Sequence, residues 1–228
     1  MELVVAVADV HQKIVIVMET AQNMNDLNLK FDDLEESMRA YAKEHHVPII
    51  QDEGLAFLEL ILQLYQPKTI LEIGTAIGYS AIRMARVCDT HIVTIERKEE
   101  MVEQAKKNIE HADLNHQIEV LFKDALDCFE DLKNKRFDLI FIDAAKAQYL
   151  NFFELFTPLL NSGGIVVCDN MSFHGLVLNQ DNYEQQSRSV RGLIRKLNNF
   201  KQNLLENQNF DTSIFNIGDG MAVSIRKG

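Results

Sequence analysis

The 228-residue sequence lacks tryptophan and contains only three prolines and three cysteines. Cys88, Cys128 and Cys168 lie far apart and match no zinc-binding spacing, so the sequence predicts neither a zinc site nor a disulfide framework. Buried, reduced cysteines are typical of a cytoplasmic protein, and we expect this location. Because there is no internal repeat and no serine- or glycine-rich linker, most of the chain is expected to form one α/β domain.

Positive charge is also scarce, because 23 lysine and arginine residues stand against 34 acidic ones and give a net charge of -11. This total provides no global positive field to attract nucleic acid, although a local basic patch is compatible with it.

The apolar stretches at residues 3–8 and 14–18 are too short to span a bilayer, and no basic region precedes them, so no secretory signal is expected. We treat residues 1–30 as an N-terminal extension that could form an extra strand, an oligomer contact or a segment upstream of an alternative start at Met24. Residues 31–228 are treated as a single domain.

The sequence does contain an expected strand, a glycine turn and an expected helix in direct succession. Residues 69–73 are mostly apolar and β-branched, Gly74 and Gly78 follow, and residues 79–87 predict a helix. This succession is typical of the nucleotide-binding corner of a doubly wound sheet, where glycine allows a ligand to lie against the backbone. The Gly-x-x-x-Gly spacing and the carboxylate of Glu72 disfavour a phosphate ligand. A tight turn beside a strand-end charge is the alternative, and these residues alone do not decide between the two.

Expected strands and helices alternate through the rest of the chain. The further strands are expected at residues 91–95, 117–122, 137–142 and 165–168. Helices are expected at residues 32–46, 54–65, 98–111, 125–132, 146–160 and 188–205, with a Ser162-Gly163-Gly164 turn before the fifth strand. Two β-rich runs, 210–217 and 221–226, are joined by Gly218-Asp219-Gly220 and predict a hairpin. The sequence therefore predicts a Rossmann-like α/β fold, with a doubly wound, mostly parallel seven-stranded sheet and a C-terminal antiparallel hairpin.

Acidic residues follow the carboxyl ends of the expected parallel strands, where open α/β sheets bind ligands. Glu96 lies about 20 residues beyond Gly74, a separation suited to binding a ribose diol. A solvated strand-end charge is the alternative. Asp124 could accept a hydrogen bond from an adenine amino group, or it could cap a helix that begins at Ala125.

A second group of polar residues follows two later strands. Asp143 and Lys146 come after one expected strand, and Asp169 and Asn170 end the next. If these strands are neighbours, two carboxylates and an amide converge into a set of hard oxygen ligands that suits Mg²⁺, Mn²⁺ or Ca²⁺ better than zinc. Each residue alone fits a cap, a surface charge or a turn, but their combination beside a glycine corner favours a metal site.

Three stretches together resemble the metal-dependent, S-adenosylmethionine-using O-methyltransferases, which include catechol and caffeoyl-CoA O-methyltransferases. They are Leu-Glu-Ile-Gly-Thr-Ala-Ile-Gly-Tyr-Ser at 71–80, Ile-Asp-Ala-Ala-Lys at 142–146 and Asp-Asn at 169–170. The similarity runs from about residue 31 to the C-terminus, which implies one methyltransferase domain. Residues 41–48 and 79–85 are most similar to bacterial tRNA 5-hydroxyuridine methyltransferases, which make 5-methoxyuridine at the wobble position. Residues 1–23 do not look like the amphipathic helix with which relatives usually begin.

The resemblance implies a role for each matching residue. The methionine end of the cofactor would be held by Glu72, Gly74, Thr75, Gly78 and Ser80. The nucleoside end would contact Glu96 through the ribose hydroxyls, and Asp124 and Ala125 through adenine. Asp143 would contact the cofactor and would also bind Mg²⁺ together with Asp169 and Asn170, while Lys146 would be the general base.

The resemblance also implies tRNA as the acceptor and a homodimer as the assembly. The candidate phosphate contacts are Arg188, Arg191, Arg195 and Lys196 on one expected helix, with Lys43, His45 and His46 as a second group. A solvated helix face would show the same spacing. The alternative is a small catechol-like or phenolic acceptor, which the negative net charge favours, with residues 169–187 as a lid and Phe173 and Tyr183 as stacking groups. A binding protein without turnover is disfavoured by the complete set of site residues, and a nicotinamide dehydrogenase by the glycine spacing.

Overall fold

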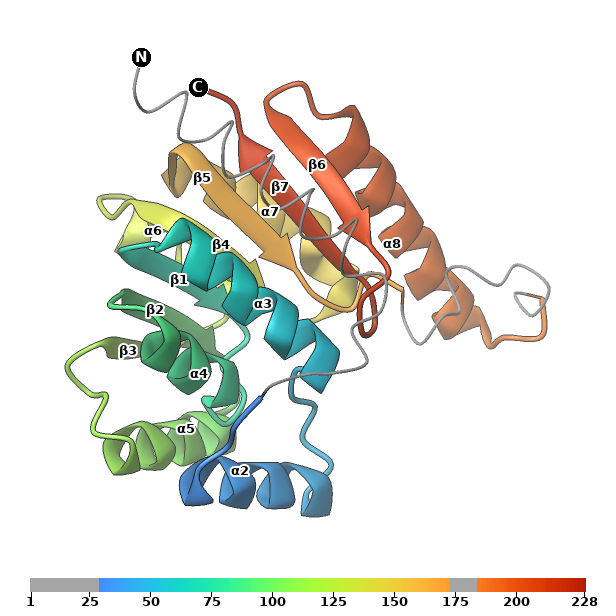
Figure 1. Ribbon diagram of the computed structural model, residues 1–228. Helices are drawn as coiled ribbons and strands as arrows, with labels where there is room; N and C mark the ends of the chain where they lie inside the picture. Colours follow the sequence, from blue (N-terminus) through green and yellow to red (C-terminus); the bar gives the residue numbers. More distant parts are fainter. Residues whose placement is uncertain (1–28, 173–183) are drawn as a thin grey trace.

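The computed structural model describes residues 29–172 and 184–228 and contains a seven-stranded sheet with the order β3-β2-β1-β4-β5-β7-β6 (Figure 1). The strands are β1 (Thr69–Ile73), β2 (His91–Glu96), β3 (Ile118–Phe122), β4 (Phe137–Ile142), β5 (Leu160–Cys168), β6 (Phe210–Phe215) and β7 (Met221–Arg226). Strands β1 to β5 pair in parallel, whereas β7 runs antiparallel to both β5 and β6. The predicted doubly wound sheet with its C-terminal hairpin is therefore confirmed.

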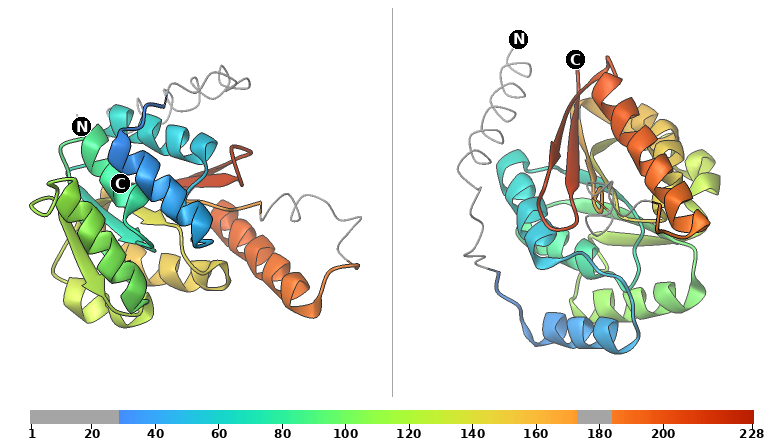
Figure 2. Two further views of the ribbon diagram at one scale, coloured as in Figure 1. Left: turned by 90° about the horizontal axis from the view of Figure 1, so that it is seen from below. Right: turned by 90° about the vertical axis from the view of Figure 1, so that its right-hand side faces the viewer.

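Helices cover both faces of the sheet, as the right-hand view of Figure 2 shows. One apolar cluster lies under α2 (Asp33–Glu44), α3 (Asp52–Tyr65), α4 (Tyr79–Val87) and α5 (Glu99–His111). The other lies under α6 (Phe129–Leu132), α7 (Tyr149–Phe156) and α8 (Arg188–Glu206). Central strands are apolar on both faces because Ile70 enters the first cluster and Leu71 the second. No helix within the described ranges is long and apolar enough to cross a membrane.

Short 3-10 helices replace parts of two expected α-helices. The expected helix at 125–132 is divided into η1 (Ala125–Asp127) and α6. The prediction of one continuous helix at 146–160 is wrong, because only α7 is α-helical there and it is flanked by η2 (Lys146–Gln148) and η3 (Thr157–Leu159). Pro158 lies in the first turn of η3. Because proline has no backbone N–H, it would interrupt a continuous α-helix but is tolerated in the first turn of a new one.

The expected turn at Ser162-Gly163-Gly164 is also wrong, because these residues lie inside β5. The β4–β5 register shifts there, so the glycines form an irregularity within a paired strand. A Cβ at Gly164 would lie 2.7 Å from Leu160 Cγ, which explains why a glycine is needed. The expected N-terminal extension, apart from residues 29 and 30, lies outside the described residues, as do Phe173 and Tyr183.

Candidate active site

The turn after β1 brings the ends of two neighbouring strands into contact. Gly74 has a φ of +106°, and a Cβ there would lie 2.0 Å from the carbonyl oxygen of Asp143. Any side chain at this position would therefore force the turn away from the end of β4. Gly78 has a φ of +84° and forms the N-cap of α4. Both glycines of the predicted corner are required by backbone geometry.

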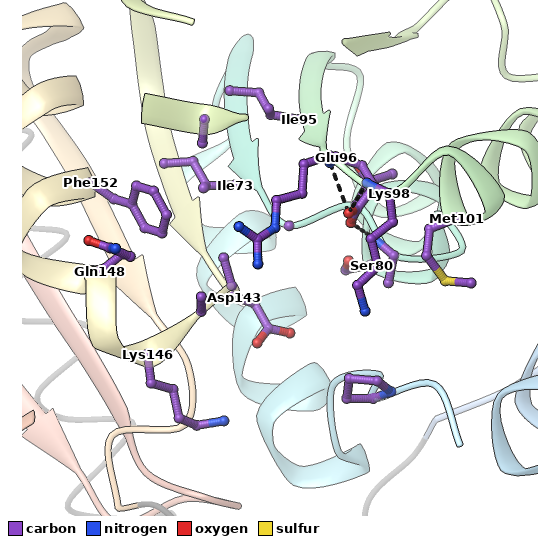
Figure 3. A pocket seen from close by; sticks show the side chains of 18 of the residues that line it. Ile73, Ser80, Ile95, Glu96, Lys98, Met101, Asp143, Lys146, Gln148 and Phe152 are labelled. Carbon is purple, nitrogen blue, oxygen red and sulfur yellow. Dashed lines mark hydrogen bonds between the residues drawn. The ribbon is translucent and has the colours of Figure 1, made fainter. Parts of the chain in front are cut away.

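A cavity of about 590 Å³ opens beside this turn (Figure 3). Most of the predicted site residues line it, namely Gly74, Thr75, Ser80, Glu96, Asp124, Ala125, Asp143, Lys146 and Asn170. Glu72, Gly78 and Asp169 do not line it. Lys146 and Gln148 lie across the cavity from Glu96 and Lys98. The cavity is therefore bounded by the carboxyl ends of several parallel strands, as the sequence predicted.

Glu72 lies behind the cavity wall and is fully buried. Ser80 Oγ and Thr94 Oγ1 each donate a hydrogen bond to its carboxyl group, and both distances are 2.5 Å. Thr94 Oγ1 also lies 2.5 Å from Thr75 Oγ1. Glu72 thus bonds to Ser80 directly and to Thr75 through Thr94, and both Ser80 and Thr75 line the cavity.

Burial raises the pKa of Glu72 from 4.5 to about 7, although its two hydroxyl partners oppose this shift. Between pH 4.5 and about pH 7, Glu72 in the native state keeps a proton that it has released in the unfolded chain. The free energy of unfolding therefore falls as the pH rises through this range. The variant Glu72→Gln removes the titration. We expect its unfolding free energy, relative to wild type, to increase from about pH 5 to about pH 8 in urea denaturation. A difference that is independent of pH would contradict this assignment.

The carboxylate of Glu96 is fixed by backbone groups at the end of β2. It accepts a hydrogen bond from the backbone N–H of Ala76 at 3.0 Å, and from those of Arg97 and Lys98 at 2.9 Å (Figure 3). These contacts hold a charged acceptor at the cavity, where it could receive hydrogen bonds from a diol.

Asp124 forms the cap that was the alternative interpretation of this residue. Its Oδ1 accepts from the backbone N–H of Leu126 at 3.0 Å, and its Oδ2 lies 3.3 Å from Arg97 Nη1. Because Asp124 also lines the cavity, capping a helix and contacting a ligand are compatible roles for it.

Strands β4 and β5 are neighbours, so the predicted polar cluster is assembled. Asn170 Nδ2 donates to Asp143 Oδ1 at 3.2 Å and to Asp169 Oδ2 at 3.1 Å. Asn170 has a φ of +59°, a left-handed conformation that asparagine tolerates better than most residues. Tyr149 Oη donates a hydrogen bond to the Asp169 carbonyl at 3.1 Å and so ties the end of β5 to α7.

The cluster concentrates negative charge where little water reaches it. Loss of water raises the pKa of Asp143, against the opposing charge of Lys146 and the hydrogen bond from Asn170. Loss of water and the charge of Asp143 raise the pKa of Asp169 to about 7. No group of three or more His, Cys, Asp or Glu residues in the described part of the chain has a metal-binding arrangement. The candidate set therefore consists of two carboxylates and one amide.

Sequence reasoning missed the segment between α2 and α3, whose residues Val47 to Gln51 form part of the cavity wall. Arg39 supports this wall, because its guanidinium bonds to both carboxylate oxygens of Asp52, at 2.6 and 3.1 Å, and to Tyr79 Oη at 3.2 Å. No local sequence pattern marks these contacts, which depend on the packing of three helices.

The two predicted basic groups lie on α8 and at the end of α2. Arg188, Arg195 and Lys196 are exposed on α8, and no carboxylate among residues 29–172 and 184–228 forms an ion pair with them. Lys43, His45 and His46 are exposed at the end of α2. The His45 ring stacks on Tyr41 at 3.9 Å, so part of this group has a structural contact.

The fold and the position of the cavity are typical of α/β proteins that bind a ligand at the carboxyl ends of their parallel strands, and an acidic cluster lies at one end of this cavity. A sequence model of the family described as O-methyltransferase matches residues 19–227. A catechol O-methyltransferase from Niastella koreensis is 36% identical over 181 residues, which are 75% of this chain and 79% of that protein.

Solved structures agree with this relationship. A Staphylococcus aureus protein described as a candidate caffeoyl-CoA O-methyltransferase is 36% identical, with a TM-score of 0.80 and coverage of 95% of this chain and 99% of that one. An O-methyltransferase from Bacillus cereus, solved in complex with SAH, is 26% identical, with a TM-score of 0.77 and coverage of 94% and 100%. The chain belongs to the S-adenosylmethionine-dependent O-methyltransferase family, of the catechol and caffeoyl-CoA type.

Proposed function

We propose that this O-methyltransferase requires Mg²⁺ and methylates 5-hydroxyuridine at the wobble position of tRNA to 5-methoxyuridine. The observation that carries the proposal is the convergence of Asp143 and Asn170 at the cavity, where Asn170 also bonds to Asp169 and Lys146 lines the same cavity. A candidate metal-binding cluster and a candidate base on one side of the cavity, across from a carboxylate suited to a ribose, support this reaction.

The cavity residues support a defined orientation of S-adenosylmethionine. Gly74, Thr75 and Ser80 would border its methionine end, with Glu72 acting through Ser80 and Gly78 through the turn. Glu96 would accept hydrogen bonds from the ribose hydroxyls. Asp124 and Ala125 would border adenine, and Asp143 would face the reacting end. The cofactor would supply a methyl group bonded to a positively charged sulfur.

The acidic cluster fits a divalent cation. Two poorly hydrated carboxylates approach one amide, and a half-turn of that amide would present its oxygen where its nitrogen now lies. Asp143, Asp169 and Asn170 would therefore hold Mg²⁺, and Mn²⁺ or Ca²⁺ are alternatives. When bound, the ion would lower the pKa of an acceptor hydroxyl.

Lys146 would accept the proton of that hydroxyl at Nζ, and Asp143 would keep the resulting ammonium close to the site. The segment from Val47 to Gln51 would exclude water while the opposite charges on the acceptor oxygen and the methyl donor cancel.

We expect Lys146→Ala to lower turnover roughly 10²- to 10⁴-fold. Its affinity for S-adenosylmethionine should stay near the wild-type value in calorimetry. Unchanged turnover would remove Lys146 from the mechanism.

The basic side chains of α8 support tRNA as the acceptor. The double variant Arg188→Glu/Arg195→Glu should weaken tRNA binding and reduce the slope of log affinity against log salt by roughly one for each arginine. The matched control is Lys106→Glu/Lys107→Glu, which makes the same charge change at exposed positions of α5. Filter binding at several salt concentrations measures both. Equal effects of the two pairs would contradict a specific role for α8.

A small catechol-like or phenolic acceptor is the second candidate, favoured by the net charge of -11 and by the catechol O-methyltransferase relative. Labelled S-adenosylmethionine should be offered with tRNA carrying 5-hydroxyuridine and, separately, with a simple catechol. Transfer to tRNA supports the main proposal, whereas transfer only to catechol would replace it with the second candidate. The homodimer and the cytoplasmic location stay predictions.

A further inference from the structure

The tip of the β6–β7 hairpin lies against the chain that follows the acidic cluster. Met171 donates its backbone N–H to the carbonyl of Gly220 at 2.8 Å, and Ser172 donates to the carbonyl of Asp219 at 2.7 Å. These bonds continue the antiparallel contact between β5 and β7 beyond its last regular pair, Cys168 with Ala222. The hairpin tip therefore holds the chain just after the two candidate metal ligands Asp169 and Asn170, and β7 holds the chain just before them.

The continued pairing contains one extra residue on the β5 side. Between the Cys168–Ala222 pair and the Met171–Gly220 bond, Asp169 and Asn170 lie opposite Met221 alone. Two residues opposite one is the arrangement of a β-bulge, which redirects side chains. Consecutive side chains of a regular strand point to opposite faces, yet those of Asp169 and Asn170 are 3.1 Å apart. The extra residue, with Asn170 in its left-handed conformation, is what allows the Asn170 side chain to bond to both Asp143 and Asp169.

The tip can approach this closely only because of its glycines. Gly220 has a φ of +84°, and a Cβ there would lie 2.3 Å from Ser172 Oγ and 2.9 Å from Ser172 N. On its other side the tip is backed by α3, because a Cβ at Gly218 would lie 3.3 Å from Gly54 N. A side chain at Gly220 would thus displace Ser172, since the tip has little room to retreat.

We propose that the hairpin tip at Gly218–Gly220 is the positioning element for the cluster: it fixes the extra residue in the β5–β7 pairing, and thereby makes Asp169 and Asn170 face Asp143. This inference rests on the proposed metal site for its functional meaning, but the positioning itself is a property of the chain. Gly220 is accordingly a positioning residue that contacts no reacting group.

The first test measures hydrogen exchange in the wild-type protein without added metal. The amides of Met171 and Ser172 should exchange as slowly as those of β5, because both are bonded to the tip. Exchange as fast as that of an unpaired chain would overturn the inference without any variant.

The second test compares Gly220→Ala with Gly192→Ala, whose added Cβ on α8 meets nothing within 4 Å. We expect Gly220→Ala to shift the side-chain amide resonances of Asn170 and to weaken Mn²⁺ binding by roughly 10- to 100-fold in calorimetry. The control should change neither. If Gly220→Ala does not fold, Gly220→Ala/Ser172→Gly, which removes the nearest side-chain contact, is measured in the same way.

The outcomes separate this inference from the proposed metal requirement. Wild-type protein that binds no Mn²⁺, combined with shifted Asn170 resonances in the Gly220 variant, would support the positioning and contradict the metal site. Wild-type protein that binds Mn²⁺, combined with a Gly220 variant that matches the control in both readouts, would overturn the positioning alone.

Discussion

Replacing Asp169 with asparagine is expected to lower methyl transfer roughly 10²- to 10³-fold, the range seen when one group that stabilises transition-state charge is lost. The substitution keeps the size of the side chain but removes one of the two carboxylates that Asn170 joins. Because Asp169 does not line the cavity, affinity for S-adenosylmethionine should remain near the wild-type value. Steady-state kinetics with either acceptor, and calorimetry for the cofactor, measure the two effects.

Asp113→Asn is the matched control for this prediction. Asp113 is exposed, lies beyond the end of α5 and has a φ of +56°, a conformation that asparagine adopts readily. It therefore makes the same charge change with little structural cost. Equal activity of the Asp169 variant and this control would show that the acidic cluster has no part in catalysis.

The variant Arg83→Met is expected to cause the largest loss of stability, about 3–5 kcal/mol, because it leaves buried carboxylates without their counter-charge. Arg83 Nε donates to Glu59 at 2.7 Å and Arg83 Nη1 to Glu35 at 3.0 Å, and the guanidinium also bonds to the Lys30 carbonyl at 2.8 Å. These bonds join α2, α3 and α4. Urea denaturation followed by circular dichroism measures the change.

Arg86→Met provides the comparison, because Arg86 also contacts Glu35, at 2.7 Å, but its side chain is 30% exposed against 9% for Arg83. In this variant Glu35 keeps its ion pair with Arg83, and Asp32, the other carboxylate partner of Arg86, is half exposed, so the loss should be roughly 1 kcal/mol. In addition, Arg83→Met/Glu59→Leu should recover part of the stability, because it removes one of the stranded charges. Similar losses for both single variants would contradict the view that burial determines the cost.

The parts of the fold that the sequence predicted well have strong local signals. The bounds of β1, α4, β4 and β7 agree with the predicted ranges, because the apolar runs of the three strands end at glycine or charged residues and α4 begins directly after Gly78. The start of β5 was wrong because a Ser-Gly-Gly stretch has the same local signal in a turn and in a strand irregularity.

Some parts of the candidate site were likewise predictable from the sequence, and others were not. The cluster of Asp143, Asp169 and Asn170 was predictable because carboxyl ends of neighbouring parallel strands meet at one edge. The place of Glu72 behind Ser80 was not, since it depends on how α4 lies over β1. The contact of Gly220 with Ser172 joins residues that are remote in sequence, and no pattern near either one indicates it.

The most direct test of the account is methyl transfer from labelled S-adenosylmethionine by protein that has been stripped of metal with EDTA and then titrated with Mg²⁺. Both acceptors, tRNA carrying 5-hydroxyuridine and a catechol, should be present in parallel reactions. We expect no transfer before titration and transfer that rises to saturation as Mg²⁺ is added. Transfer to either acceptor that is undiminished by EDTA would contradict a metal requirement at Asp143, Asp169 and Asn170.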